Sequence, residues 1–301
     1  MRFLGAGGKR GVIAGVILFA VGVGGPCALP LGADALLIRR PGRGSAARLA
    51  AALQAELQRL GDPIRILELS GDAPADAARL SRESQGRPVL YAVGPDAAEI
   101  AGQASGSGVV SLGVPNPAQV KTPGIYVSIY PRLEGVLGLL GSGLGVKRAG
   151  LLFSPAHNRE VGLAFIRAGQ AAGVVIQPLP VGSSGELIRR LRSGLDDIDV
   201  LLLPVDPILF DRRNLEHVVS ETRKARVPTV GFLEGLERLG VTITVMADPV
   251  AVAQAAVGAA GDPVTVGKRR MEVDGWSVVV SAAAAAELGL SRGAIDALQA
   301  R

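Results

Sequence analysis

The chain has 301 residues, of which 48% are hydrophobic, and its formal net charge at pH 7 is +5. A chain of this length can bury a core without disulfide or metal support, and two lobes are a better expectation than one large domain. The mean hydropathy of +0.35 comes largely from alanine and glycine, and no stretch after Ala35 offers the roughly 18 apolar residues that indicate a membrane-spanning helix.

The amino terminus has the pattern of an export signal. Arg2, Lys9 and Arg10 precede an uncharged apolar run at residues 11–23, and Ala33-Asp34-Ala35 follows. A basic region, an apolar region and an A-x-A site are typical of a Sec-type signal peptide, here residues 1–35. We therefore expect a periplasmic protein. An uncleaved membrane anchor is the alternative, because no charge occurs between residues 10 and 34.

Cysteine and histidine are scarce. Cys27 is the single cysteine, and the preceding Gly24-Gly25-Pro26 is a poor lipidation signal. Cleavage after Ala35 would remove it, together with three basic residues and one acidic residue, and would lower the net charge from +5 to +3. The exported chain would then form no disulfide, and His157 and His217 are too few for a structural zinc site. We expect no metal and no other cofactor.

The composition and motifs argue against two further classes. Arginine residues are scattered among acidic ones and aromatic residues are only 3% of the chain, so a phosphate-tracking or base-stacking surface is not expected. The sequence has neither a G-x-x-x-x-G-K-[ST] loop nor a G-x-S-x-G elbow, and no set of nucleophile, base and oxyanion donors can be assembled. We predict that the protein is not an enzyme and does not bind nucleic acid.

The first half of the body predicts repeated strand–helix units. Short apolar runs alternate with segments whose leucines recur at helical spacing, as in Leu49, Leu53 and Leu57. Such units build a parallel sheet with helices on both faces. The expected strands are Leu36–Ile38, Ile64–Leu69, Pro88–Val93, Val109–Leu112 and Gly124–Ile129, and the expected helices are Ala46–Leu60, Ala75–Ser84, Ala97–Ala104 and Arg132–Leu140.

A second, similar series follows and predicts a second sheet. Its tail differs, because Arg269–Val273 and Trp276–Val280 flank Asp274-Gly275 and suggest a β-hairpin. A short alanine helix, Ala282–Leu288, comes after it. The other expected strands are Ala149–Phe153, Val174–Leu179, Val200–Leu203, Pro228–Phe232 and Val241–Met246, and the other expected helices are Arg159–Ala172, Gly185–Gly194, Leu209–Ala225 and Pro249–Ala260.

The most informative segment is Asp196–Pro207. Val200–Leu203 is apolar at every position, as expected of a parallel strand covered on both faces. Pro204 and Pro207 end the strand and leave Asp206 at the carboxyl edge of the sheet, where open α/β folds bind ligands. Asp206 is therefore a candidate ligand-binding residue. Capping of the helix that begins near residue 208 is an alternative role, and the two roles are compatible.

Other turn residues occupy the same kind of edge. Two sheets that face each other with such turns form a cleft whose closure can trap a small ligand. For Gly94 and Pro95 a plain turn, and for Phe232 a place in the core, remain alternatives. His157 also lies in an edge turn, where it either contacts the ligand or is solvated. The candidate ligand-binding residues are Gly94, Pro95, Asp96, Asn116, Ser154, Asn158, Asp206 and Phe232.

Several phrases, in order, resemble the tryptophan/tyrosine-type substrate-binding proteins of ABC transporters. They are Tyr91-Ala-Val-Gly-Pro-Asp-Ala-Ala, Lys147-Arg-Ala-Gly-Leu-Leu-Phe-Ser-Pro with Asn158, Asp199-Val-Leu-Leu-Leu-Pro-Val-Asp-Pro, Val227-Pro-Thr-Val-Gly-Phe, and the tail Val278–Leu290. The resemblance covers most of the chain after residue 35.

The resemblance implies a type I periplasmic-binding-protein fold: two doubly wound parallel-sheet lobes with a C-terminal hairpin and short helix, and three crossings of the chain between them. On that pattern lobe 1 is residues 36–147 plus 246–261, and lobe 2 is residues 148–245 plus 262–301. The implied function is binding of a small solute, with amino acids among the candidates, and its delivery by a monomer to a membrane permease. Ligand-facing turns would be residues 94–96, residues 154–158 and Asp206.

One departure from the family motif motivates a second hypothesis. Pro95 stands where the family usually has a hydroxyl residue, which removes a backbone N–H and a side-chain hydroxyl from the expected ligand edge. Aromatic residues that could stack on an aromatic solute are also few. The same fold with a degenerate cleft would serve as a periplasmic sensor or accessory module that acts on a membrane sensor protein.

Overall fold

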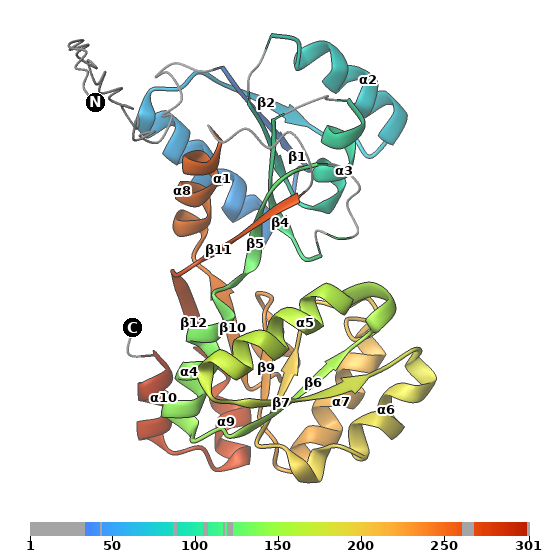
Figure 1. The fold of residues 1–301 in the computed structure, drawn as a ribbon, viewed down its shortest axis with the longest axis vertical. Coiled ribbons are helices and arrows are strands. Elements are labelled where there is room, and N and C mark those ends of the chain that lie inside the picture. Colours follow the sequence, from blue (N-terminus) through green and yellow to red (C-terminus); the bar gives the residue numbers. More distant parts are fainter. Residues whose placement is uncertain are drawn as a thin grey trace, which may run out of the picture.

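The computed structural model describes residues 34–42, 44–86, 89–104, 108–116, 118, 123–260 and 268–299. These residues form two α/β lobes joined by a narrow waist (Figure 1). The expected fold class is confirmed. The expected signal peptide lies outside the described residues, apart from its last two positions.

Lobe 1 is built on a six-stranded parallel sheet with the strand order β11-β5-β4-β3-β1-β2. Helices α1 and α8 pack on one face of this sheet, and α2 and α3 pack on the other. The strands are β1 (Ala35–Arg39), β2 (Ile64–Glu68), β3 (Val89–Val93), β4 (Val109–Val114), β5 (Gly124–Pro131) and β11 (Lys268–Val273); the helices are α1 (Ser45–Leu60), α2 (Ala73–Glu83), α3 (Pro95–Ala104) and α8 (Pro249–Ala259).

Lobe 2 repeats this plan with the strand order β12-β10-β9-β8-β6-β7, in which only β12 is antiparallel to its neighbour. Helices α4, α5 and α10 cover one face, and α6 and α7 cover the other. The strands are β6 (Arg148–Phe153), β7 (Val175–Pro180), β8 (Val200–Leu203), β9 (Thr229–Gly231), β10 (Ile243–Ala247) and β12 (Trp276–Val280); the helices are α4 (Leu133–Leu144), α5 (Pro155–Ala172), α6 (Ser184–Arg192), α7 (Arg212–Lys224), α9 (Ala282–Leu288) and α10 (Arg292–Gln299).

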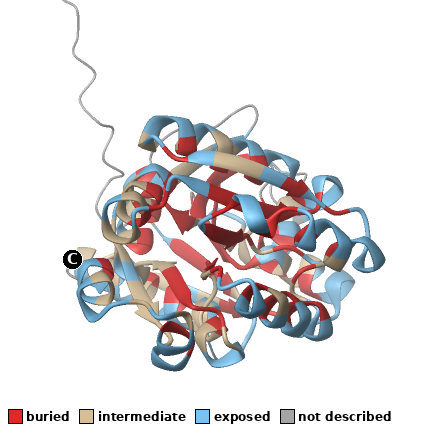
Figure 2. Cartoon of the chain, turned by 90° about the horizontal axis from the view of Figure 1, so that it is seen from below, coloured by how far each residue is buried: buried red, intermediate tan, exposed pale blue. Residues whose placement is uncertain are grey.

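The central strands of both sheets are buried and the outer helix faces are exposed, as Figure 2 shows. Every residue of β8 is fully buried, which agrees with the prediction of a strand covered on both faces. Helix α8 begins at the predicted Pro249, and Asp248 caps it, since Asp248 Oδ1 accepts the Val250 N–H at 3.1 Å. Local sequence patterns therefore place these elements correctly.

The chain crosses between the lobes after β5, after β10 and after β11. Two segments of lobe 1 consequently end at other residues than expected. The first ends after β5 and not at residue 147, and the second ends after β11 and not at residue 261. Helix α4 belongs to lobe 2, because Leu133 and Val136 are buried in one core with Phe165 of α5. Strand β11 belongs to lobe 1, where it pairs with β5. An amphipathic helix does not show in its own sequence which sheet it will cover.

The prediction of a C-terminal β-hairpin is wrong. Strands β11 and β12 do not pair with each other: β11 lies parallel to β5 in lobe 1, and β12 lies antiparallel to β10 in lobe 2. Asp274 and Gly275 therefore form the third crossing between the lobes instead of a hairpin turn. Both β5 and β10 would otherwise end their sheets with unpaired backbone groups, and each is completed by one of the two strands.

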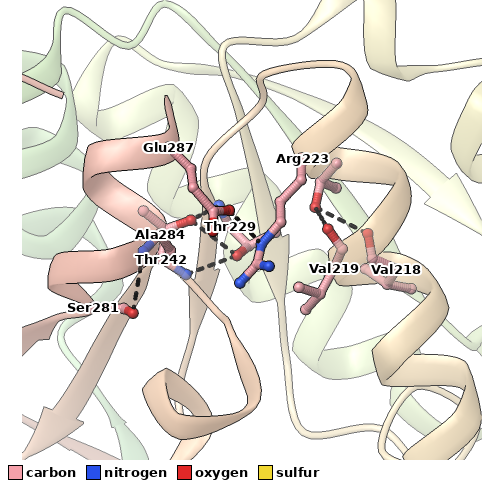
Figure 3. A network of polar contacts seen from close by, with 9 residues as sticks. Val218, Val219, Arg223, Thr229, Thr242, Ser281, Ala284 and Glu287 are labelled. Atoms are coloured by element: carbon pink, nitrogen blue, oxygen red, sulfur yellow. Dashed lines mark hydrogen bonds and ion pairs between the residues drawn. The ribbon is translucent and has the colours of Figure 1, made fainter. Parts of the chain in front are cut away.

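The C-terminal helices are attached to lobe 2, and Figure 3 shows the polar contacts around α9. Helix α9 spans the predicted residues and is capped by Ser281, whose Oγ accepts the Ala284 N–H at 3.5 Å. Glu287 of α9 pairs with Arg223 of α7 at 3.3 Å. Helix α10 was not expected from the sequence; its Leu298 is fully buried in the core of lobe 2.

Candidate ligand-binding site

The carboxyl ends of both sheets point toward the waist of the molecule. Each sheet reverses its strand order beside its first strand, at β1/β3 in lobe 1 and at β6/β8 in lobe 2, and open α/β sheets bind ligands at such points. The residues predicted from the sequence follow β3, β4, β6, β8 and β9. They therefore all lie at the correct edge, but the structure gives them different roles.

Asp206 is fully buried and its carboxylate is engaged within lobe 2. Its Oδ2 accepts the Ser154 N–H and the Asn158 side-chain amide, both at 2.8 Å, and its Oδ1 accepts the Ile208 N–H at 2.9 Å. These bonds join the end of β6 to the end of β8. Asp206 thus stabilises the edge of the sheet. The capping alternative is wrong, because α7 begins at Arg212 and is capped by Asp211; the Ile208 N–H lies in the turn before that helix.

Asn158 and Tyr130 extend this polar cluster. Asn158 is 1% exposed and donates a second hydrogen bond to the Val205 carbonyl at 2.9 Å. The Val205 N–H donates to the Tyr130 hydroxyl at 3.0 Å. Burial raises the pKa of Tyr130 far above its usual value, so the hydroxyl stays protonated. Asn158 is held in a non-helical conformation within α5 by these contacts.

The turn after β3 is a structural turn with an ion pair at its end. Gly94 has a φ of +92°, a left-handed conformation that favours glycine, and its N–H donates to the Leu112 carbonyl at 2.8 Å. Pro95 is the first residue of α3. Asp96 pairs with Arg40 at 2.9 Å, and both side chains are about half exposed. None of these three predicted residues lines the cavity described below.

Polar contacts between described residues also cross the cleft between the lobes. The side-chain amide of Asn116, after β4, donates to the His157 carbonyl at the start of α5. Arg48 of α1 pairs with Glu234, after β9, with Nη2 and Oε2 2.5 Å apart. Asn116 is therefore a predicted residue that the structure brings to the opposite lobe. Both contacts link loops at the carboxyl edges of the two sheets.

A cavity of about 290 Å³ lies between the lobes at the crossing strands. Residues from α1, β4, β5 and α8 of lobe 1 and from the ends of β9, β10 and β12 line it, so its volume depends on how the lobes are placed. Its lining consists of Ser45, Ala46, Arg48, Leu49, Gly113, Pro115, Ser128, Ile129, Phe232, Leu233, Glu234, Met246, Ala247, Pro249, Val252 and Ser277.

Phe232 is the one predicted site residue that lines this cavity. It is also part of the core, because it is 2% exposed and packs edge-on against Tyr130 and Phe165, with ring centroids 5.5 Å and 5.2 Å away. Phe232 therefore has the expected place in the core, and contact with a ligand stays a prediction. The aromatic cluster fixes the end of β9 and with it the loop that carries Glu234.

The sequence analysis missed Arg48, Glu234 and the residues of the crossing strands. Glu234 stands three residues beyond β9 and Arg48 is in the first turn of α1, which follows β1. Both belong to loops or helix starts at carboxyl edges, and that criterion, applied to charged residues as well as to turns, could have identified them. The crossing strands carry no such signal, because their site residues lie within the strands and not in turns at the carboxyl edges.

Solved structures share this arrangement. An ABC domain in complex with L-Trp from Streptococcus pneumonia is 16% identical with a TM-score of 0.55, and the match covers 89% of this chain and 98% of that one. A ligand-free, open substrate-binding protein with adhesive properties from Clostridium difficile is 15% identical with a TM-score of 0.64, over 86% and 95% of the two chains. This chain has the type I periplasmic-binding-protein fold. A periplasmic ribose ABC transporter protein from Conexibacter woesei shares the fold at 12% identity and a TM-score of 0.51, over 92% and 100%.

No family model and no curated protein matches the sequence, so the similarity to these solved structures is a similarity of fold. Within the described residues, no group of histidine, cysteine and acidic side chains has the arrangement of a metal site. No helix in that part of the chain is both long and apolar enough to span a membrane.

Proposed function

We propose that this protein is an exported solute-binding protein of an ABC transporter, which binds a small solute in the cleft between its lobes. The observation that carries this proposal is the cavity at the crossing strands, since its lining comes from both lobes. A solute in such a cavity contacts both lobes at once and therefore favours the closed arrangement over the open one. The solute-binding proteins of the same fold support this proposal.

The proposed cycle involves no covalent chemistry. The solute enters the open cleft, rotation about the crossing strands buries it, and a membrane permease recognises the closed form. We infer that the protein works as a periplasmic monomer after removal of residues 1–35. A reporter fused after residue 60 should be exported, and its retention in the cytoplasm would contradict this location.

A thermal-shift screen of the purified protein tests the binding role. The panel contains amino acids, nucleosides, sugars, small anions and uncharged aromatic compounds. A solute present at about 100 times its dissociation constant adds about 2.7 kcal/mol to the free energy of unfolding. For a domain of about 150–250 residues this corresponds to roughly 5–10 °C in Tm. A panel without any stabilising compound would contradict the proposal.

Closure needs a separate measurement, because a compound can stabilise the protein without moving the lobes. Spin labels at Ala78→Cys on α2 and Ser193→Cys after α6 are exposed and report the distance between lobes. A Cys27→Ser background removes the natural cysteine. We expect a bound solute to narrow the distance distribution. Binding with an unchanged distribution would contradict the transport cycle.

A periplasmic sensor or accessory module is the second candidate function. The observation that favours it is the polar cluster of lobe 2, where Asp206, Asn158 and the Ser154 N–H are bonded to each other instead of facing the cleft. A folded protein that binds no small molecule, but changes the spacing of its lobes with a membrane sensor protein, would support this alternative.

A further inference from the structure

The residues that line the cavity indicate which chemical class of solute it would bind. Among the described residues that line the cavity, only Arg48 and Glu234 are charged. Three serines are polar, and the remaining lining residues are apolar side chains or glycine. Leu49 and Val252 of lobe 1 and Met246 of β10 contribute hydrocarbon or thioether surface. The cavity therefore favours a solute with a large apolar surface.

The two charged groups of the lining neutralise each other. The Arg48 Nη2 and the Glu234 Oε2 are 2.5 Å apart, and the Glu234 side chain is only 30% exposed. An anionic solute would have to take Arg48 from Glu234, and a cationic solute would have to take Glu234 from Arg48. Loss of Arg48 would leave the partly buried Glu234 carboxylate without its partner, which is unfavourable. Loss of Glu234 would cost less, because the Arg48 side chain is 51% exposed. A zwitterion could pair with both side chains, but it would first have to separate them and give up the hydration of its own two charges. The lining thus favours a solute without charged groups.

Sugar hydroxyls would also find few partners. Ser128 is 3% exposed, and its Oγ already accepts the Tyr130 N–H at 3.0 Å and an N–H of Arg270 at 3.3 Å. The polar groups of Asp206 are engaged in lobe 2, as described above. Within the described part of the chain, the hydroxyl groups of Ser45 and Ser277 make no hydrogen bond of this kind. A solute with many hydroxyls would bury most of them without a hydrogen bond.

We propose that the cavity binds an uncharged, predominantly apolar solute with a single polar end, whose apolar body lies against Leu49, Met246 and Val252 and whose polar end faces the Arg48–Glu234 pair. This inference rests on the proposed function and narrows it to one class of solute. A cavity of about 150 Å³ holds benzene. A cavity of about 290 Å³ therefore suits a solute of roughly 10–14 non-hydrogen atoms.

Matched pairs of probes test this proposal by isothermal titration calorimetry on the purified protein. Indole is compared with L-tryptophan and p-cresol with L-tyrosine, because each pair shares its ring and differs in the charged amino-acid group; ribose serves as the polyhydroxylated probe. We expect indole and p-cresol to bind at least tenfold more tightly than their amino-acid partners, and ribose not to bind. Tighter binding of an amino acid or of ribose would overturn this proposal and leave the solute-binding function intact. Binding of none of the probes or screened compounds would overturn both.

Substitution of a residue that lines the cavity tests whether the solute binds there. Ala46 lines the cavity from α1, and Ala46→Trp would fill part of it. Ala55 is an exposed alanine of the same helix outside the lining, so Ala55→Trp is the matched control. We expect Ala46→Trp to weaken binding of the neutral probes more than tenfold and Ala55→Trp to leave it within twofold, at equal Tm. Equal binding by both variants would place the solute elsewhere and overturn the assignment.

Discussion

Replacing Asp206 distinguishes a structural carboxylate from a ligand-binding one. In the structure this buried carboxylate accepts three hydrogen bonds, from Ser154, Asn158 and Ile208, all within lobe 2. Asp206→Ala removes all three acceptor contacts at once. Asp206→Asn is the gentler change, because the remaining oxygen can still accept from Ser154 and Asn158, while the new amide group faces the Ile208 N–H. The two variants therefore differ in the number of donors left unpaired.

The size of the effect follows from the burial of these donors. Ser154 and Asn158 are at most 1% exposed, so water does not replace the lost acceptor. A buried donor without a partner costs about 1–3 kcal/mol. Asp206→Ala should therefore lower the free energy of unfolding by about 2–6 kcal/mol, and Asp206→Asn by about 1–3 kcal/mol. The larger loss is a substantial part of the roughly 5–15 kcal/mol that stabilises a typical domain.

Urea unfolding followed by the fluorescence of Trp276 measures this loss. Trp276 is the only tryptophan and packs against the core of lobe 2, so its emission reports the correct lobe. Asp211→Ala is the control, because Asp211 is an exposed cap of α7 and its loss costs about 1 kcal/mol. If Asp206→Ala is no less stable than the control, the role assigned to this carboxylate is wrong.

Two further predictions concern packing and pH. Gly135→Ala should destabilise lobe 2 by about 1–3 kcal/mol and shift the emission of Trp276, because the added Cβ would lie 2.6 Å from the indole ring. Gly138→Ala on the same helix has open space around the added Cβ and should stabilise lobe 2 by about 0.5–1 kcal/mol. Equal changes in the free energy of unfolding, measured in urea, would contradict this packing. The Ser70 N–H holds the pKa of Asp76 below its usual value, so this carboxylate stabilises the fold fully above about pH 4 and loses its effect as the pH falls further. The difference in Tm between wild type and Asp76→Asn should therefore narrow between pH 7 and pH 3, and a constant difference would refute the assignment.

Repeated strand–helix units and short-range signals were sufficient to predict the two parallel sheets. The uniformly apolar Val200–Leu203 is a fully covered strand, and the helices predicted to begin at Pro249 and Ala282 begin there. These features depend on residues within a few positions of each other, where periodicity and capping chemistry act directly. The sequence also placed the candidate residues at the correct edges, because the carboxyl ends of parallel strands share one side of a sheet.

The tertiary structure decided which of these residues face a ligand cavity and which face each other. Asp206 and Asn158 satisfy one another, so their hydrogen-bonding capacity is used within the lobe. Arg48 and Glu234 are far apart in the sequence and meet because the chain crosses the waist three times. The partners of β11 and β12 likewise depended on which sheet edges remained unpaired. Contacts of this kind arise from the packing of two lobes, and a local pattern of residues does not encode them.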